Sequence, residues 1–174
     1  MQRIVIIGSS CAGKTTLAKN IAQKLAIPHF ELDALHWKAN WVESSAEEFR
    51  RKVQQALNEQ QSWVIDGNYS RARDIIWPKA TTLIWLNYAF PVVFYRAIKR
   101  TIRRAWTKEK ICGENYESFR QSFLSKNSIL IWVVQTHAKK IRDYDKVLQQ
   151  PEHQHLKQLV FRNPNEAKDF LNKL

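Results

Sequence analysis

An eight-residue stretch near the start of the chain, Gly8-Ser9-Ser10-Cys11-Ala12-Gly13-Lys14-Thr15, matches the pattern GxxxxGK[ST]. A β-branched run, Arg3 to Ile7, leads into it, and apolar residues spaced by four follow it, as in an amphipathic helix. Glycines in such a loop let backbone N–H groups close around an anion, and the helix N-terminus adds the positive end of a dipole. We call this stretch the phosphate loop, and it predicts a nucleotide triphosphate site.

Two side chains at the end of the phosphate loop have predicted roles. Lys14 would supply a positive charge to the terminal phosphates, and the Thr15 hydroxyl would be a ligand of Mg²⁺. Cys11 fits the loop as a small side chain, and the alternative is a reactive thiol whose pKa the helix dipole lowers. We therefore expect ATP and Mg²⁺ as ligands, with contacts to the nucleotide from Gly8, Ser9, Ser10, Cys11, Ala12, Gly13, Lys14, Thr15 and Thr16.

Short apolar runs alternate with helical patterns along the chain. Besides Arg3–Ile7, we expect strands at His29–Leu32, Trp63–Ile65, Thr82–Leu86 and Leu159–Phe161. We expect a polar loop over residues 106–116, a mostly helical segment over 117–148 that includes Ile129–Val134, and a last helix from Pro164. This alternation predicts a single three-layer α/β domain over residues 1–174, with a five-stranded parallel sheet.

The helix expected from Pro91 to about Ala105 separates apolar from cationic residues. At about 100° per residue, one side of this helix carries the apolar residues Phe94, Ile98, Ile102 and Ala105. The opposite face carries Arg96, Lys99, Arg100, Arg103 and Arg104. Cations on one helix face repel one another, so we expect an anion to compensate them.

The net charge of +12 is concentrated in one part of the chain. Residues 90–146 hold 13 Lys and Arg against 5 Asp and Glu, a net +8. With 44% hydrophobic residues the composition excludes a disordered basic tail. The longest apolar run is Ile129–Val134, too short for a membrane span, and the two cysteines are too few for a disulfide framework. We expect a cytoplasmic protein without membrane contact.

Two aspartates follow predicted strands. Asp66 ends the Trp63–Ile65 run and can hold Mg²⁺ through water, the alternative being an ordinary loop aspartate. Asp33 follows the second strand, where helix capping is the alternative to a role in binding.

Several segments together resemble a known family. The phosphate loop, the Asp66-Gly67 segment with arginines after it and the basic helix resemble the nucleoside and nucleotide kinases among the P-loop NTPases. More closely, Leu32-Asp33-Ala34-Leu35-His36-Trp37-Lys38, Asp66–Arg73 and the arginine-rich helix resemble the adenylate-kinase-like DNA topology modulation (FlaR-related) proteins of bacteria, also labelled AAA-family ATPases. The resemblance covers nearly the whole chain.

The resemblance implies transfer of the γ-phosphoryl group of Mg·ATP to a small-molecule or nucleotide acceptor. It implies a helical lid within residues 90–146, where Arg100, Arg103 and Arg104 close over the transferred phosphate and Arg142 approaches from the return helix. Asp33 would orient or deprotonate the acceptor, and Arg71 and Arg73 would contact it. His36 and Trp37 would line the acceptor pocket, with packing as their alternative. Asp66 would contribute both to the metal site and to the binding of the acceptor.

Two further positions come from the resemblance. Arg162, with Asn163 and Pro164, would pack on the adenine. The family often has an acidic residue after the fourth strand where this chain has Asn87, which leaves Asp66 to organise the metal. The same arginines fit a nucleic-acid backbone, so a nucleotide-dependent protein that binds DNA non-specifically stays open as an alternative, as does a nucleotide-binding switch with little turnover.

Overall fold

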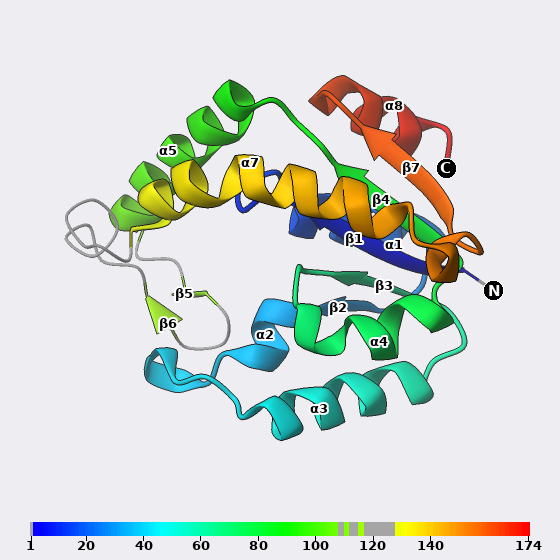
Figure 1. Cartoon of the computed structure of the whole chain (residues 1–174). Coiled ribbons are helices and arrows are strands. Elements are labelled where there is room, and N and C mark those ends of the chain that lie inside the picture. Colours follow the sequence, from blue (N-terminus) through cyan, green and yellow to red (C-terminus); the bar gives the residue numbers. More distant parts are fainter. Residues whose placement is uncertain (1, 108–109, 112–114, 117–127) are drawn as a thin grey trace.

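The computed structural model describes residues 2–107, 110–111, 115–116 and 128–174. Its centre is a five-stranded sheet in the order β2-β3-β1-β4-β7, parallel at every pairing (Figure 1). The strands are β1 (Arg3–Gly8), β2 (His29–Glu31), β3 (Trp63–Asp66), β4 (Thr82–Leu86) and β7 (Lys157–Phe161). The predicted five-stranded parallel sheet is confirmed.

Helices connect the strands and cover both faces of the sheet. They are α1 (Lys14–Leu25), α2 (Leu32–His36), α3 (Ala46–Asn58), α4 (Arg73–Ile76), α5 (Phe90–Thr107), α7 (Ile129–Leu148) and α8 (Pro164–Asn172). Short 3₁₀ turns lie at Ala39–Trp41, Ser70–Ala72, Trp77–Lys79 and Pro151–His153. The sequence patterns did not indicate α2 and α4, which are too short to show a helical period.

The central strand β1 is buried on both sides, as its unbroken apolar run predicts. Ile4 and Ile6 belong to a core formed with α1, α5 and α8, whereas Val5 and Ile7 belong to a core formed with α3 and α4. Helix α7 contributes to both cores, since its first half joins the former and its second half the latter. The domain therefore has the predicted three layers.

The apolar side predicted for α5 is not its most buried side. Val93, Ala97 and Thr101 are fully buried, whereas Ile102 is 49% exposed. These smaller side chains allow close approach to α7 and the phosphate loop, where the Arg96 guanidinium donates a 2.6 Å hydrogen bond to the Ala12 carbonyl. Relative to an arrangement in which its apolar side is buried, α5 is rotated about its axis. As a result, three arginines spaced by four are half-buried and face inward: Arg96, Arg100 and Arg104.

The region after α5 also differs from the prediction of a loop over 106–116. Helix α5 runs to Thr107, and β5 (Lys110–Ile111) pairs antiparallel with β6 (Asn115–Tyr116). Ile129–Val134 is helical as predicted, whereas the part of the expected helix at 117–127 lies outside the described residues. Among the helices of the described ranges, none has the length and apolarity required to cross a membrane.

Candidate active site

The phosphate loop leaves the carboxyl end of β1, at the middle of the sheet, and enters α1. Gly13 is the N-cap residue of α1 with a left-handed φ of 101°, and Cys11 also takes a positive φ, of 66°. At Gly8, an added Cβ would lie 2.8 Å from the Leu86 carbonyl oxygen of the neighbouring strand. Gly13 is therefore required by its backbone conformation, and Gly8 is required by close packing against the neighbouring strand.

Lys14 lies at the centre of the site. Its Nζ donates a 3.2 Å hydrogen bond to the Ser9 carbonyl, within the loop that the bound phosphates would share. Burial lowers the pKa of Lys14, and the nearby charges of Asp33 and Asp66 oppose that effect. The ammonium group thus contacts the phosphate loop and is within electrostatic range of both predicted aspartates, and its role in phosphate binding stays a prediction.

Thr15 and Asp66 meet across the first turn of α1. The Thr15 hydroxyl donates a 2.8 Å hydrogen bond to Asp66 Oδ2, and His29 Nε2 lies 2.6 Å from Oδ1 of the same carboxylate. Asp66 is 2% exposed. Within the described ranges, no three His, Cys, Asp or Glu side chains gather as a metal site, so the remaining Mg²⁺ ligands would have to be phosphate oxygens and water. The oxygen atoms of Thr15 and Asp66 fit a Mg²⁺ ion that takes its other ligands from phosphate and water.

Glu31 adds a carboxylate that the sequence analysis did not select. It lies beside Asp66 in the register of β2 and β3, at the carboxyl edge of the sheet. Burial, with the charges of Asp66 and Asp33, raises the pKa of Glu31. Glu31, Asp33 and Asp66 therefore form the acidic side of the site opposite Lys14. The signal was available in the sequence, because Glu31 lies at the end of a predicted strand and Asp33 directly follows that strand.

Three polar contacts hold the phosphate loop from distant parts of the chain. Asn68 accepts a 3.2 Å hydrogen bond from the Gly8 amide through Oδ1 and donates one to the Gly8 carbonyl. The buried Ser9 and His137 side chains lie 2.9 Å apart, Oγ to Nδ1. Arg96 holds the Ala12 carbonyl. The sequence analysis missed Asn68 and His137 as loop contacts, since nothing local marks a partner 60 or 128 positions away.

Cations from α5 and α7 extend the charge of Lys14. The charge of Arg100 lowers the pKa of Lys14. The Nε atom of Arg100 is buried without a hydrogen-bond partner among the described residues. From α7, Lys140 approaches Lys14, and burial together with that neighbouring charge lowers the pKa of Lys140 to about 8. The positive charges that α1, α5 and α7 bring together at the phosphate loop fit a polyphosphate anion.

The other cations predicted for the lid lie differently. Arg104 is half-buried on the inward side of α5, but Arg103 is on its exposed side. Arg142 is exposed on α7, so Lys140 is the cation of the return helix that faces the loop.

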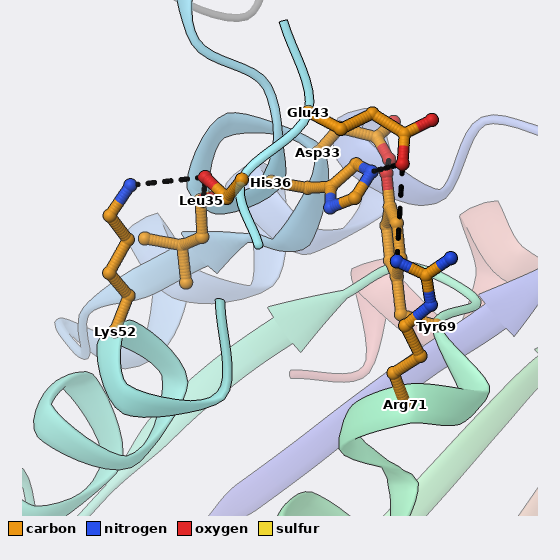
Figure 2. Close-up of polar contacts among 8 residues, drawn as sticks. Asp33, Leu35, His36, Glu43, Lys52, Tyr69 and Arg71 are labelled. Carbon is orange, nitrogen blue, oxygen red and sulfur yellow. Dashed lines mark hydrogen bonds and ion pairs between the residues drawn. The ribbon is translucent and has the colours of Figure 1, made fainter. Parts of the chain in front are cut away.

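A cluster of polar side chains surrounds α2 beside the acidic side (Figure 2). The Tyr69 hydroxyl donates a 2.7 Å hydrogen bond to Asp33 Oδ1. Glu43 Oε2 lies 3.6 Å from His36 Nε2 and 3.9 Å from Arg71 NH1. We call Asp33, His36, Glu43, Tyr69 and Arg71 the α2 cluster. It brings together three residues predicted for the acceptor, Asp33, His36 and Arg71.

Aromatic rings form the apolar part of the α2 cluster. The His36 ring lies 5.0 Å from that of Trp37 and 4.7 Å from that of Tyr69, centroid to centroid. His36 is buried, which agrees with the packing alternative for this residue, whereas Trp37 is half-buried. Arg73 is more remote from the polar groups, because its guanidinium stacks 4.8 Å above the Trp77 ring.

Two predicted nucleotide contacts lie at the margin of the site. Thr16 is exposed on α1. Arg162 is exposed at the carboxyl end of β7, on the same sheet edge as Gly8, because Leu86 pairs with both Gly8 and Phe161. The side chain of Asn163 caps α8 by accepting from the Asn165 and Glu166 amides.

The family model of the ATPase family associated with various cellular activities (AAA) matches residues 4–70, the segment from β1 to just beyond Asp66. No curated protein sequence matches the chain. Among solved structures, the shikimate kinase of Acinetobacter baumannii in complex with shikimate is similar over 99% of this chain and 90% of its own, with a TM-score of 0.59 and 14% identity. The chain has the P-loop NTPase fold.

Two further structures have this P-loop NTPase fold at similar distance. A sugar kinase from Janibacter sp. HTCC2649 has a TM-score of 0.57 and 15% identity, over 99% of this chain and 91% of its own. A gluconokinase from Sinorhizobium meliloti 1021 has a TM-score of 0.52 and 17% identity, over 99% of this chain and 92% of its own. These P-loop structures are of small-molecule kinases and give no support to DNA topology modulation.

Proposed function

We propose that the chain is an ATP-dependent kinase that transfers the γ-phosphoryl group of Mg·ATP to a hydroxyl group of a small acceptor. One observation carries the proposal: Asp33, oriented by the Tyr69 hydroxyl at 2.7 Å, is close enough to Lys14 for its charge to act on the lysine pKa. A carboxylate that could accept an acceptor proton is thus within electrostatic range of the ammonium group that would bind the transferred phosphate. The similarity to small-molecule kinases supports the same proposal.

The residues around the nucleotide would divide the work of positioning and charge stabilisation. Backbone amides of the phosphate loop and Lys14 would bind the phosphates, and Arg100 and Lys140 would add positive charge from the α5 and α7 side. Thr15 and Asp66 would hold Mg²⁺, which when bound supplies further positive charge to the phosphate oxygens. Phosphoryl transfer depends mainly on such positioning and electrostatics, so these residues would supply most of what the reaction needs.

On the acceptor side, Asp33 would receive the hydroxyl proton or orient the hydroxyl for attack. Tyr69 would hold the Asp33 carboxylate toward the phosphate loop. A base positioned in this way contributes about 10²- to 10⁴-fold to the rate.

An acceptor screen with labelled ATP tests the proposal. The panel contains sugars, sugar acids, nucleosides, nucleoside monophosphates and small alcohols, and acceptor-dependent product is measured with Mg²⁺ present. For an acceptor that is phosphorylated, Asp33→Asn should lower kcat by about 10² or more, with little change in ATP affinity. The exposed Asp169→Asn on α8 is the matched control. Unchanged turnover in Asp33→Asn, or ATP hydrolysis that no acceptor stimulates, contradicts the proposal.

DNA binding is not proposed, because the basic helix does not present its arginines together to solvent. Arg96 bonds the Ala12 carbonyl, and Arg100 acts on Lys14. A titration with duplex DNA at two salt concentrations measures the affinity for DNA directly. Affinity that falls steeply with salt would favour the DNA alternative instead.

A further inference from the structure

The charge of Arg71 is opposed within the α2 cluster. A single oxygen of Glu43, Oε2, lies 3.9 Å from Arg71 NH1 and 3.6 Å from His36 Nε2 (Figure 2). Arg71 and Glu43 are both 55% exposed, so their attraction is weak in energy, but the carboxylate places a negative charge beside the guanidinium that an incoming anion would use. Arg71 is therefore not presented as an empty binding site for an anion.

The other cations around the α2 cluster also have partners. Arg50 forms two hydrogen bonds with Asp74, of 2.8 and 2.7 Å, and the Arg73 guanidinium stacks on Trp77. Lys38 and Lys52 both pair with Glu48, at 2.5 and 2.9 Å. Recognition of a carboxylate or phosphate commonly uses a guanidinium that can bind it with two parallel hydrogen bonds. Each of these arginines and lysines is already engaged by another group.

The net charge of the α2 cluster is negative. Asp33 and Glu43 contribute −2 and Arg71 contributes +1, which leaves −1 when His36 is neutral. The Tyr69 hydroxyl that holds Asp33 is an uncharged donor. An anion placed between Asp33 and Glu43, on the side away from Lys14, would meet like charge from two carboxylates, whereas a hydroxyl group would meet an acceptor for its proton.

From these contacts we infer that the acceptor is an uncharged hydroxyl compound, and that Glu43 excludes acceptors with a carboxylate or phosphate by opposing the charge of Arg71. The inference rests on the proposed function, because it names the acceptor class for the same site. The rings of His36, Trp37 and Tyr69 provide apolar surface next to Asp33, which suits the carbon skeleton of a polyol or nucleoside.

Matched pairs of acceptors test the inference in the wild-type protein. The members of each pair have closely related carbon skeletons, and one member carries an anionic group that the other lacks: gluconate against glucose, uridine monophosphate against uridine, and shikimate against its methyl ester. In any pair that is phosphorylated, the uncharged member should have the higher kcat/KM, by about tenfold or more for a charge at a few ångströms from the carboxylates. A preference for the anionic member overturns the inference while leaving the proposed kinase activity intact.

Substitution of Glu43 tests the cause. Glu43→Gln keeps the shape of the side chain and removes the charge that opposes Arg71, so the ratio of kcat/KM for the anionic over the uncharged member should rise about tenfold. The double variant Glu43→Gln with Arg71→Gln should lose that rise, which separates a freed guanidinium from a general change in charge. Glu47→Gln, at an exposed glutamate in the first turn of α3, is the control and should leave the ratio unchanged.

The outcomes of this experiment separate the two proposals. An unchanged ratio in Glu43→Gln overturns the role of Glu43. Absence of turnover with both members of every pair, in a protein that binds Mg·ATP, overturns the proposed function and this inference together. Because Glu43 is 55% exposed, its substitution should leave the fold intact, which a thermal unfolding curve checks.

Discussion

The Thr15 hydroxyl donates its hydrogen bond to Asp66 across 2.8 Å, and this contact joins the start of α1 to the end of β3. A threonine at this position of a phosphate loop is expected to turn its oxygen toward Mg²⁺. The same hydroxyl cannot donate to a metal ion, so its proton needs an acceptor, and Asp66 provides one. Asp66 thus supports Thr15 as a ligand even before its own carboxylate is considered.

Removal of the Asp66 charge should impair the Mg²⁺-dependent reaction strongly. Asp66→Asn keeps the side-chain size but weakens the attraction for the cation and replaces an acceptor oxygen by a donor. We expect kcat to fall about 10²- to 10³-fold, a loss typical of one electrostatic group at a reacting centre. The measurement is turnover as a function of Mg²⁺ concentration, with Asp169→Asn as control. Wild-type turnover in Asp66→Asn would contradict a role for Asp66 in the Mg²⁺-dependent reaction.

His29 should act as a positioning residue for Asp66. His29→Ala removes the group 2.6 Å from Asp66 Oδ1, so the Mg²⁺ concentration for half-maximal turnover should rise about 10-fold or more, as for other groups that orient metal ligands. His29→Gln can still donate a hydrogen bond and should recover part of the loss. A purely structural role predicts instead that both variants lose stability equally and keep the wild-type Mg²⁺ requirement.

Nucleotide affinity should depend on the charge of Lys140. Because the pKa of Lys140 is lowered to about 8, the side chain is charged at pH 7 and loses its proton as the pH rises toward 9. ATP affinity should therefore decrease over this range, and Lys140→Arg, which stays charged, should abolish most of the decrease. Equilibrium binding at pH 7, 8 and 9 measures it.

The controls for this pH dependence come from the ligand and the loop. ATP phosphates are already ionised above pH 7, so their titration falls outside the range. The Cys11 thiol lies near Lys14, and a free thiol ionises near pH 8.5, so the series should be repeated in Cys11→Ser. A pH dependence that Lys140→Arg leaves unchanged contradicts the assignment to Lys140.

Acid should destabilise the fold before the carboxylates titrate. Burial lowers the pKa of His137 and of His153, so both stay neutral in the folded protein at pH values where the unfolded chain binds protons. The contribution of these two histidines to the free energy of unfolding should be fully present near pH 7.5 and fall as the pH decreases through about 6.5. Glu48, whose pKa is lowered to about 2 by hydrogen bonds from Lys38 and Lys52, loses its contribution only below its usual pKa of 4.5.

Urea unfolding at pH 7.5, 6.5 and 5.5 measures the histidine effect. The double variant His137→Gln with His153→Gln should lower stability at pH 7.5 and flatten its pH dependence. A wild-type stability that does not change between pH 7.5 and 5.5 would show that the two histidines are not held neutral.

Asn68 should contribute to stability through the backbone of Gly8. Asn68→Ala leaves the Gly8 amide and carbonyl without their side-chain partner, which should cost about 1–3 kcal/mol of unfolding free energy. ATP affinity should fall as well, since Gly8 begins the phosphate loop. Asn172→Ala, at an exposed position at the end of α8, should change stability by less than about 0.5 kcal/mol. Equal effects of the two substitutions in chemical denaturation would contradict the role of Asn68.

The sequence alone predicted the five strands of the central sheet and the phosphate loop that follows the first of them. Unbroken β-branched runs such as Arg3–Ile7 specify strands buried on both faces, and the glycines, Lys14 and Thr15 specify a phosphate site, because these depend on residues close together in the chain. Asp33 and Asp66 were also selected, since the carboxyl ends of parallel strands meet at one edge of a sheet.

Tertiary structure decided which neighbours those residues have. Helix α5 carries apolar residues on both sides of its arginines, so its period could not show that Val93 and Ala97 are buried and Ile102 is exposed. The partners His29, Asn68 and His137 come from distant positions, and the opposition of Arg71 by Glu43 depends on how the segment between α2 and α3 folds. Local sequence fixes conformation and chemical type, whereas hydrogen bonds and charge balance arise only from contacts between segments that packing brings together.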